Sequence, residues 1–324
     1  MKKLNSLYKT VALGAIALVS TSCTDDANSI EENDSQSKFV SIIAGIGTNQ
    51  AKDTRTTYEA NIQQDGSASM IIRWEEEEEI AIFHKGLYHI EGESNNSRRW
   101  VEDFDILRSD KNGLSDEGKY TTFRGKVTVT DMGGYEQEYC AMYPIPDEIS
   151  VIDEGRWSSP TLHYSFKMEN TQDCLEPTAH LKKNDIMSCS SLHYPFESGI
   201  DFEHRLAILR IAVTIPESKS IKSLTLSTPS SKIFYNKINV RLYGNDSGAT
   251  MYGEENSNSF TLNLLNDVAD KQVTAYMMMC PNSTVNTLTV TAVAEDGTSY
   301  SKTFNSGNTR IQQGYCYTIK QALQ

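Results

Sequence analysis

The sequence predicts an all-β protein made of two antiparallel β-sandwich domains in tandem. From Phe39 onward apolar residues recur with a period of two, which is the spacing of half-buried strands. Turn signals such as Glu295-Asp296-Gly297 separate the alternating runs, as in hairpins. No long amphipathic helix pattern is present, so strands must bury their apolar faces against other strands.

The strands follow one another along the whole chain. The first contains Val40, Ile42, Ala44 and Ile46, which alternate with Ser41, Ile43 and Gly45. The later strands are expected at 69–74, 80–83, 120–130, 138–143, 206–215, 221–226, 260–264, 273–279, 287–294 and 298–304. Loop-like sequence near 185–200 separates two strand-rich halves, so we place the domains at 38–190 and 191–324.

The first 22 residues are expected to be a removable signal peptide. Basic Lys2, Lys3 and Lys9 precede a short apolar run at 11–19, and small residues then lead into Cys23. The run is too short to span a bilayer, which takes about 20 apolar residues. A cysteine at this point favours a lipoprotein, in which Cys23 carries the lipid. The alternative is an ordinary secretory signal with a chance cysteine.

Residues 23–37 are predicted to be a disordered acidic tether between the lipid and the fold, because they are rich in Asp and Glu and poor in apolar residues. Asp25-Asp26 resembles the export tag of some cell-surface lipoproteins. The whole chain has a net charge of −13, which argues against a nucleic-acid partner. Such a chain is expected at the outer membrane or cell surface, where disulfides can form. We expect mostly buried free thiols.

Neither a cofactor nor a metal is expected, and no catalytic residue is predicted. No CxxC pair, zinc spacing or nucleophile motif occurs. The five carboxylates of 75–79 could form a cation site or an acid–base pair, but a solvated turn between two strands is the simpler interpretation. Trp74 ends an apolar strand and is expected in the core. Trp100 and Trp157 have polar neighbours and are candidates for stacking on sugars.

Five landmarks, taken in order, resemble those of the fimbrillins, the type V pilus subunits of Gram-negative anaerobes. The first is Thr54-Arg55-Thr56, and the second is Trp74 to Ile82, which resembles W-x-x-G-D-x-I-x-I with Glu77 and Glu78 in place of Gly and Asp. The third is Ala141-Met142-Tyr143-Pro144. The fourth is Asp185-Ile186-Met187 followed by Phe202 to Ala207 (D-x-M … F-x-H-x-L-A), and the fifth is Gly314 to Ile319. The resemblance spans nearly the whole mature chain. Because the Gly-Asp pair is missing, the shape of the turn at 77–78 is open.

The resemblance implies two transthyretin-like sandwiches in a subunit that is exported as a lipoprotein and then cut after an arginine. The cut removes the first strand, here Val40, Ile42, Ala44 and Ile46, and another subunit's strand fills the groove. Arg55 is the candidate cut site and Lys52 the second, in a polar segment at 48–55. The alternative is that Arg55 merely begins the next strand.

The end of the chain offers a candidate donor strand. Tyr315, Tyr317, Ile319 and Leu323 form an alternating apolar set, which fits equally the last strand of its own domain. The sequence thus predicts a structural or adhesive pilus subunit without enzyme activity. Its expected partners are other pilus subunits, the outer membrane through the lipid, and a host or bacterial surface ligand. The alternative is a surface glycan-binding lipoprotein. An enzyme would need two convergent carboxylates, for which there is no signal.

Overall fold

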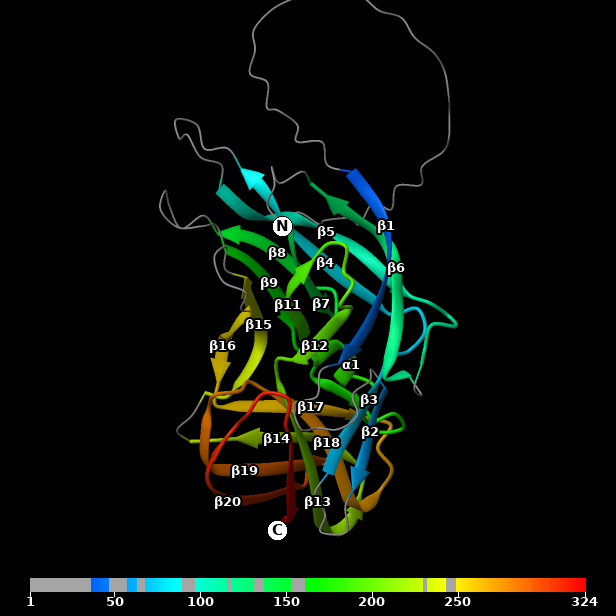
Figure 1. Ribbon diagram of the computed structural model, residues 1–324. Helices are drawn as coiled ribbons and strands as arrows, with labels where there is room; N and C mark the ends of the chain where they lie inside the picture. The colour runs from blue at the N-terminus through cyan, green and yellow to red at the C-terminus, as the bar shows by residue number, and fades with distance from the viewer. Residues whose placement is uncertain are drawn as a thin grey trace, which may run out of the picture. The chain divides into compact units, whose positions relative to one another are not determined.

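The computed structural model describes residues 36–46, 57–62, 68–88, 97–115, 118–130, 137–152, 161–229, 232–242 and 249–324. The chain divides into two units, 1–32 and 33–324, and every described residue belongs to the second. The described part holds strands β1 to β21 and a single four-residue helix, α1 (Leu181–Asn184). The prediction of an all-β protein is therefore confirmed (Figure 1).

Seven strands form a closed sheet in the N-terminal half. Their order around the sheet is β1 (Gln36–Ile46), β12 (Ile200–His204), β11 (Met187–His193), β7 (Glu138–Tyr143), β4 (Glu79–Tyr88), β5 (Ser97–Ser109) and β6 (Tyr120–Val129). Inside it lies a core of aromatic and branched side chains that includes Trp74, Phe123 and Phe202.

Two smaller sheets accompany the closed sheet. One has the order β16 (Ala249–Ser257), β15 (Phe234–Leu242), β9 (Thr161–Lys167) and β8 (Glu148–Ile152). The other is the hairpin of β2 (Thr57–Ile62) and β3 (Ala68–Arg73). The buried Met70 and Ile72 of β3 share a core cluster with Ile208 and Tyr276 of the C-terminal half. The hairpin thus joins the two halves of the chain through apolar packing.

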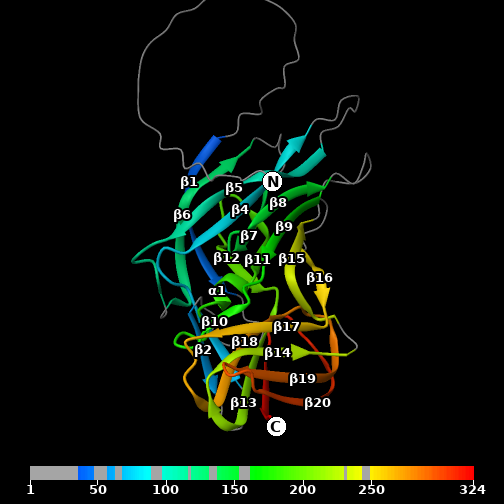
Figure 2. The same cartoon turned by 180° about the vertical axis from the view of Figure 1, so that it is seen from behind.

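The C-terminal half contains two further sheets that share one apolar core. The larger has the order β10 (Thr171–Asp173), β17 (Ser259–Leu265), β14 (Ile221–Ser227), β19 (Thr284–Ala294) and β20 (Ser299–Arg310). The smaller has β18 (Asp270–Met279), β13 (Ala207–Lys219) and β21 (Cys316–Ala322). Strands β17, β14, β19 and β20 lie side by side in Figure 2.

Two tandem transthyretin-like sandwiches are not confirmed, because the N-terminal half closes into one seven-stranded sheet. The closure comes from β1, which pairs with β6 and also with β12. Strands on either side of residue 190 share sheets, since β12 joins the closed sheet and β15 pairs with β9. The division into 38–190 and 191–324 stays a prediction.

Candidate strand-exchange site

Strand β1 completes the closed sheet by pairing along both of its edges. On one side it runs antiparallel to β6 over ten residue pairs, from Gln36↔Val129 to Gly45↔Tyr120. On the other it runs parallel to β12, from Ala44↔Ile200 to Ile46↔Phe202. Removing β1 would leave unpaired backbone groups on both neighbours, which is the hazard of an open sheet edge.

The side chains of β1 alternate sharply between core and solvent. Val40, Ile42 and Ala44 are 8%, 1% and 0% exposed, whereas Phe39 and Ile43 on the opposite face are 69% and 61% exposed. The side chain of Ile46 lies outside the described residues. Burying a Val or Ile side chain is worth about 1.5–3 kcal/mol. Strand β1 therefore contributes apolar packing as well as hydrogen bonds.

An aromatic cluster around Trp74 belongs to the same core as β1. The Trp74 ring centroid lies 5.1 Å from that of Phe123, 5.4 Å from Tyr143 and 5.5 Å from Phe202, each in an edge-on arrangement. Such geometry suits the aromatic quadrupole. Trp74, Tyr143 and Phe202 each belong to a different sequence landmark, so three landmarks meet in the core of the closed sheet. Trp74 is a core residue, as its sequence position predicts.

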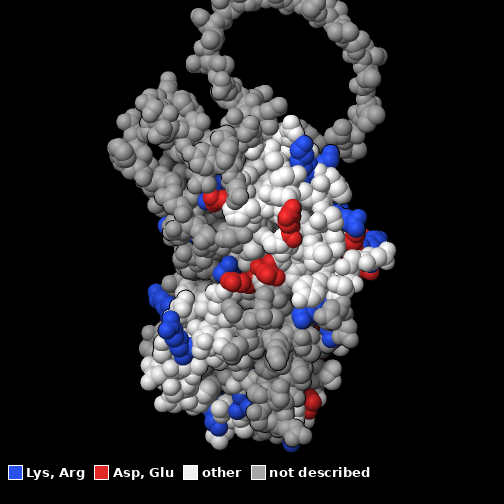
Figure 3. Space-filling view, viewed as in Figure 1, with Lys and Arg blue, Asp and Glu red and all other residues white. Residues whose placement is uncertain are grey.

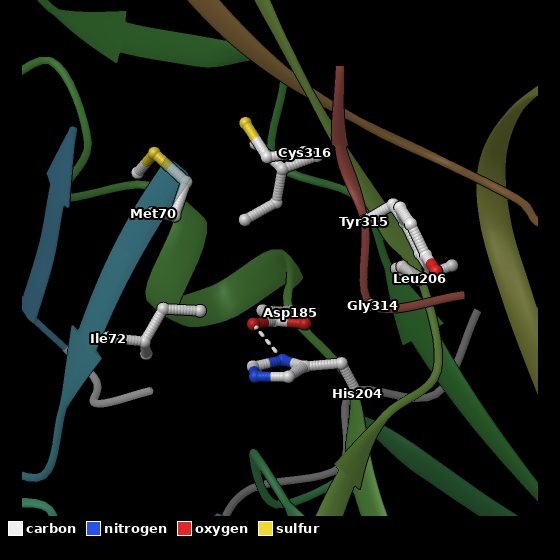
Figure 4. A pocket seen from close by; sticks show the side chains of 9 residues that line it. Met70, Ile72, Asp185, His204, Leu206, Gly314, Tyr315 and Cys316 are labelled. Carbon is white, nitrogen blue, oxygen red and sulfur yellow. Dashed lines mark ion pairs between the residues drawn. The ribbon is translucent and has the colours of Figure 1, made fainter. Parts of the chain in front are cut away.

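Other landmark residues meet beside β3, at the small cavity of Figure 4. His204 Nδ1 lies 2.7 Å from Asp185 Oδ2, and both side chains are buried. The amide of Gly314 donates a hydrogen bond to the carbonyl of Leu206 at 2.8 Å. The D-x-M, F-x-H-x-L-A and closing segments are thus joined by direct polar contacts, which sequence alone did not reveal.

The acidic run at 75–79 forms the turn between β3 and β4. Its carboxylates diverge: Glu75 pairs with Lys182, Glu77 lies 3.0 Å from Lys111 Nζ, and Glu79 lies 2.6 Å from Arg108 Nε. Among the described residues no three His, Cys, Asp or Glu side chains gather as a metal site would require. The arrangement is that of a solvated turn.

Glu77 adopts a left-handed backbone conformation in this turn, a conformation that glycine usually supplies. Its φ angle is +62°, in the left-handed region where side chains other than glycine are disfavoured. The pattern that this segment resembles has glycine here, and glycine adopts such a conformation without strain. Lys111 pairs with the substituted side chain, and this contact raises the pKa of Lys111.

Several predicted residues lie outside the described part of the chain. These are Cys23, Lys52, Arg55, Trp157 and the side chain of Trp100. Strand β2 begins at Thr57, two residues after Arg55. None of the described helices is long and apolar enough to cross a membrane. Lipidation and cleavage therefore stay predictions.

Strand β21 is an edge strand of its three-stranded sheet in this structure. It runs parallel to β13, from Ile208↔Cys316 to Thr214↔Ala322, and lies at the edge of its sheet. Ile319 and Leu323 are buried in the C-terminal core, and Tyr317 packs partly against it. Tyr315 is more exposed. A groove of about 330 Å³ runs beside β21 and is lined by Leu288, Phe304 and Ile319 among others.

Titratable groups beside these strands are perturbed mainly by burial. Burial lowers the pKa of His84 in β4, although Asp105 and Asp103 oppose the shift. It also lowers the pKa of His180, whose Nε2 lies 2.9 Å from the carbonyl oxygen of Tyr276. The five described cysteines form no disulfide with one another, and burial raises the pKa of the Cys316 thiol to about 11. A reactive thiol needs a depressed pKa, so the raised pKa of Cys316 fits a role in packing.

Comparisons with known proteins give structural likenesses at low identity. No protein-family model matches the sequence, and no curated protein is similar to it in sequence. A structure described as a cell adhesion protein of Bacteroides uniformis has a TM-score of 0.47 and 12% identity over 87% of this chain and 92% of its own. A second, from Bacteroides ovatus, has a TM-score of 0.46 and 12% identity over 89% and 95%.

The tip fimbrial protein of Porphyromonas gingivalis, with a C-terminal truncation, is a more distant likeness. Its TM-score is 0.27 and its identity 9%, over 86% of this chain and 84% of its own. At TM-scores below 0.5 these likenesses do not indicate what this chain binds.

On the face seen in Figure 3, acidic and basic side chains are interspersed.

Proposed function

We propose that this chain is a structural and adhesive subunit of a type V pilus at the cell surface. It would be exported as a lipoprotein through Cys23, cut after Arg55, and assembled by strand addition in the place of β1. The observation that carries the proposal is the position of β1, which is the first described strand and lies between β6 and β12. It joins β2 through residues 47–56, which contain the candidate cut site.

The packing of β1 supports this proposal in physical terms. A strand that pairs along both edges leaves two open edges and an apolar core when it departs. Such a gap is unstable in water, so it would favour an incoming strand of matching pattern. The hairpin β2–β3 follows the candidate cut and packs its own apolar residues against the C-terminal half. A cut at Arg55 would therefore break the covalent link between β1 and β2, allow β1 to be displaced, and leave that packing in place.

The test is the intact mass and N-terminal sequence of the protein taken from its native cell surface. A chain that begins at Thr56 and carries no lipid is the expected result for a stalk or tip subunit. A chain that begins at acylated Cys23 would contradict cleavage. It would leave an anchor subunit or a surface glycan-binding lipoprotein.

A further inference from the structure

The inward side chains of β1 become more completely buried toward the C-terminal end of the strand. Val40 retains a little exposure, Ile42 almost none, and Ala44 none. Ala44 is also the point where β1 is paired on both sides, with the buried Thr121 of β6 and the buried Ile200 of β12. A larger side chain at this position would have to displace the packed core, and overpacking is destabilising.

The next residue is restricted as well. A β-carbon added at Gly45 would lie 2.8 Å from Cε1 of Tyr120 and 3.3 Å from Oδ1 of Asp201. The Tyr120 ring is partly exposed and has room to move, so this second restriction is the weaker one. Gly45 lies on the opposite face of the strand from Ala44, so the limit inside the closed sheet rests on Ala44.

We infer that the gap selects its incoming strand by size, and that this chain's own C-terminal strand does not fit it. The accepted strand carries apolar residues at the positions of Val40 and Ile42 and Ala or Gly at the position of Ala44. The partner is therefore a subunit of different sequence rather than a second copy. This inference rests on the proposed strand exchange and specifies its partner.

The registers that set a residue from Tyr315 to Ile319 at the position of Val40 all fail when the strand runs in the direction of β1. If Tyr317 takes the position of Val40, Gln321 falls at the position of Ala44. If Thr318 or Ile319 takes that position, Lys320 or Gln321, respectively, falls at the position of Ile42. The overlay starting at Cys316 also sets Lys320 at Ala44. Burying an amide or an ammonium group without a partner is costly. The overlay starting at Tyr315 avoids this cost but sets Ile319 at Ala44 and tyrosines at the two positions before it.

The experiment uses the full chain carrying an engineered protease site within 47–56. After cutting, labelled peptides compete with the retained β1. The panel consists of the 36–46 sequence, the same peptide with Ala44→Leu, a matched control with Ser41→Leu on the exposed face, and the 315–324 sequence. We expect the 36–46 and Ser41→Leu peptides to enter equally, the Ala44→Leu peptide about 10-fold less, and the 315–324 peptide not at all. Entry of the 315–324 or Ala44→Leu peptide within threefold of the 36–46 peptide would overturn the inference.

A second measurement separates this inference from strand exchange itself. In the uncut chain, Ala44→Leu is expected to lower Tm by about 2–6 °C, whereas Ser41→Leu leaves it nearly unchanged. If no peptide enters, including the 36–46 sequence, strand exchange fails and the Tm values decide the size limit. Equal Tm values for the two variants would then overturn the limit.

Discussion

Strand β1 in the N-terminal half pairs along both of its edges, whereas β21 in the C-terminal half pairs along one. Both strands alternate apolar and polar residues, so their sequences look equally suited to exchange. Their surroundings differ. The inward residues of β1 lie inside a closed sheet, and those of β21 lie at the margin of a core shared by two open sheets. Loss of β1 would therefore open the closed sheet, while loss of β21 would remove one edge strand from a three-stranded sheet.

We therefore expect exchange to depend on both neighbours of a strand as well as on its apolar pattern. A strand held on two sides would leave a gap bounded by both neighbours, and a replacement strand would have to fit between them. An edge strand leaves no such gap, but it departs at lower cost because only one ladder of hydrogen bonds breaks. On this basis we propose the position of β1 as the acceptor position. The role of β21 as a donor stays a prediction.

The largest expected effect distinguishes the two faces of β1. Ile42→Asp places a carboxylate in the core of the closed sheet and should lower the free energy of unfolding by about 3–5 kcal/mol. The adjacent Ile43→Asp is the matched control, since that side chain is mostly exposed, and should change it by less than about 1 kcal/mol. Urea denaturation followed by tryptophan fluorescence measures both. Similar losses for the two variants would mean that β1 is not seated as described.

A second substitution pair tests how firmly β21 is held. Ile319→Ala should cost about 2–4 kcal/mol, because the side chain is buried in the C-terminal core. Tyr315→Ala, at the exposed start of the strand, should cost under about 1 kcal/mol. The urea denaturation midpoints of the two variants measure these losses of stability. If Ile319→Ala is as mild as Tyr315→Ala, β21 is not part of the C-terminal core.

Acidification should weaken both halves through two histidines. The pKa values of His84 and His180 are lowered by burial, so the unfolded chain binds protons that the folded chain does not as pH falls below about 6.5. Stability is complete above that pH and declines below it. His84→Gln should reduce the decline through the closed sheet, and His180→Gln through the C-terminal half. Thermal unfolding between pH 7.5 and 5 measures this, and an unchanged pH profile in both variants would refute the assignment.

The smallest expected effect is a gain. Glu77→Gly relieves the left-handed backbone of the acidic turn and should stabilise the chain by about 0.5–1 kcal/mol. Glu76→Gly is the control, because Glu76 is not among the residues with positive φ, and it should be neutral or mildly destabilising. Differential scanning calorimetry resolves the two. A loss of stability with Glu77→Gly would show that the Lys111 contact matters more than the backbone.

The sequence predicted the strands whose alternation is clean. The strand at 138–143 is observed with the predicted bounds, and 221–226 is one residue longer. Strands β5, β15 and β16 were not predicted, because charged and amide residues interrupt their apolar pattern. Strand β9 was also missed, although Leu162, Tyr164 and Phe166 alternate with more polar residues. The closed sheet was not predicted either, since the parallel pairing of β1 with β12 joins residues more than 150 positions apart.

The candidate site was predictable in one of its parts only. The inward stripe of β1 follows from period two, and the structure places Val40, Ile42 and Ala44 in the core. The proposed size limit at Ala44 could not be inferred from the sequence, because its pairing partners Thr121 and Ile200 lie on strands distant in the chain. The contact of His204 with Asp185 was also hidden, although both residues stood in recognised landmarks.

The most direct test of strand exchange is to lock β1 in place. Ser41 on β1 lies opposite Arg124 on β6, and both side chains are exposed, so a Ser41→Cys/Arg124→Cys pair should form a cross-strand disulfide. The measurement is incorporation of the locked chain into surface polymers, with Ser41→Cys alone as the control. We predict that the oxidised double variant is excluded from polymers, that reductant restores its incorporation, and that the single variant assembles normally. Normal assembly of the oxidised, disulfide-locked chain would contradict exchange of β1.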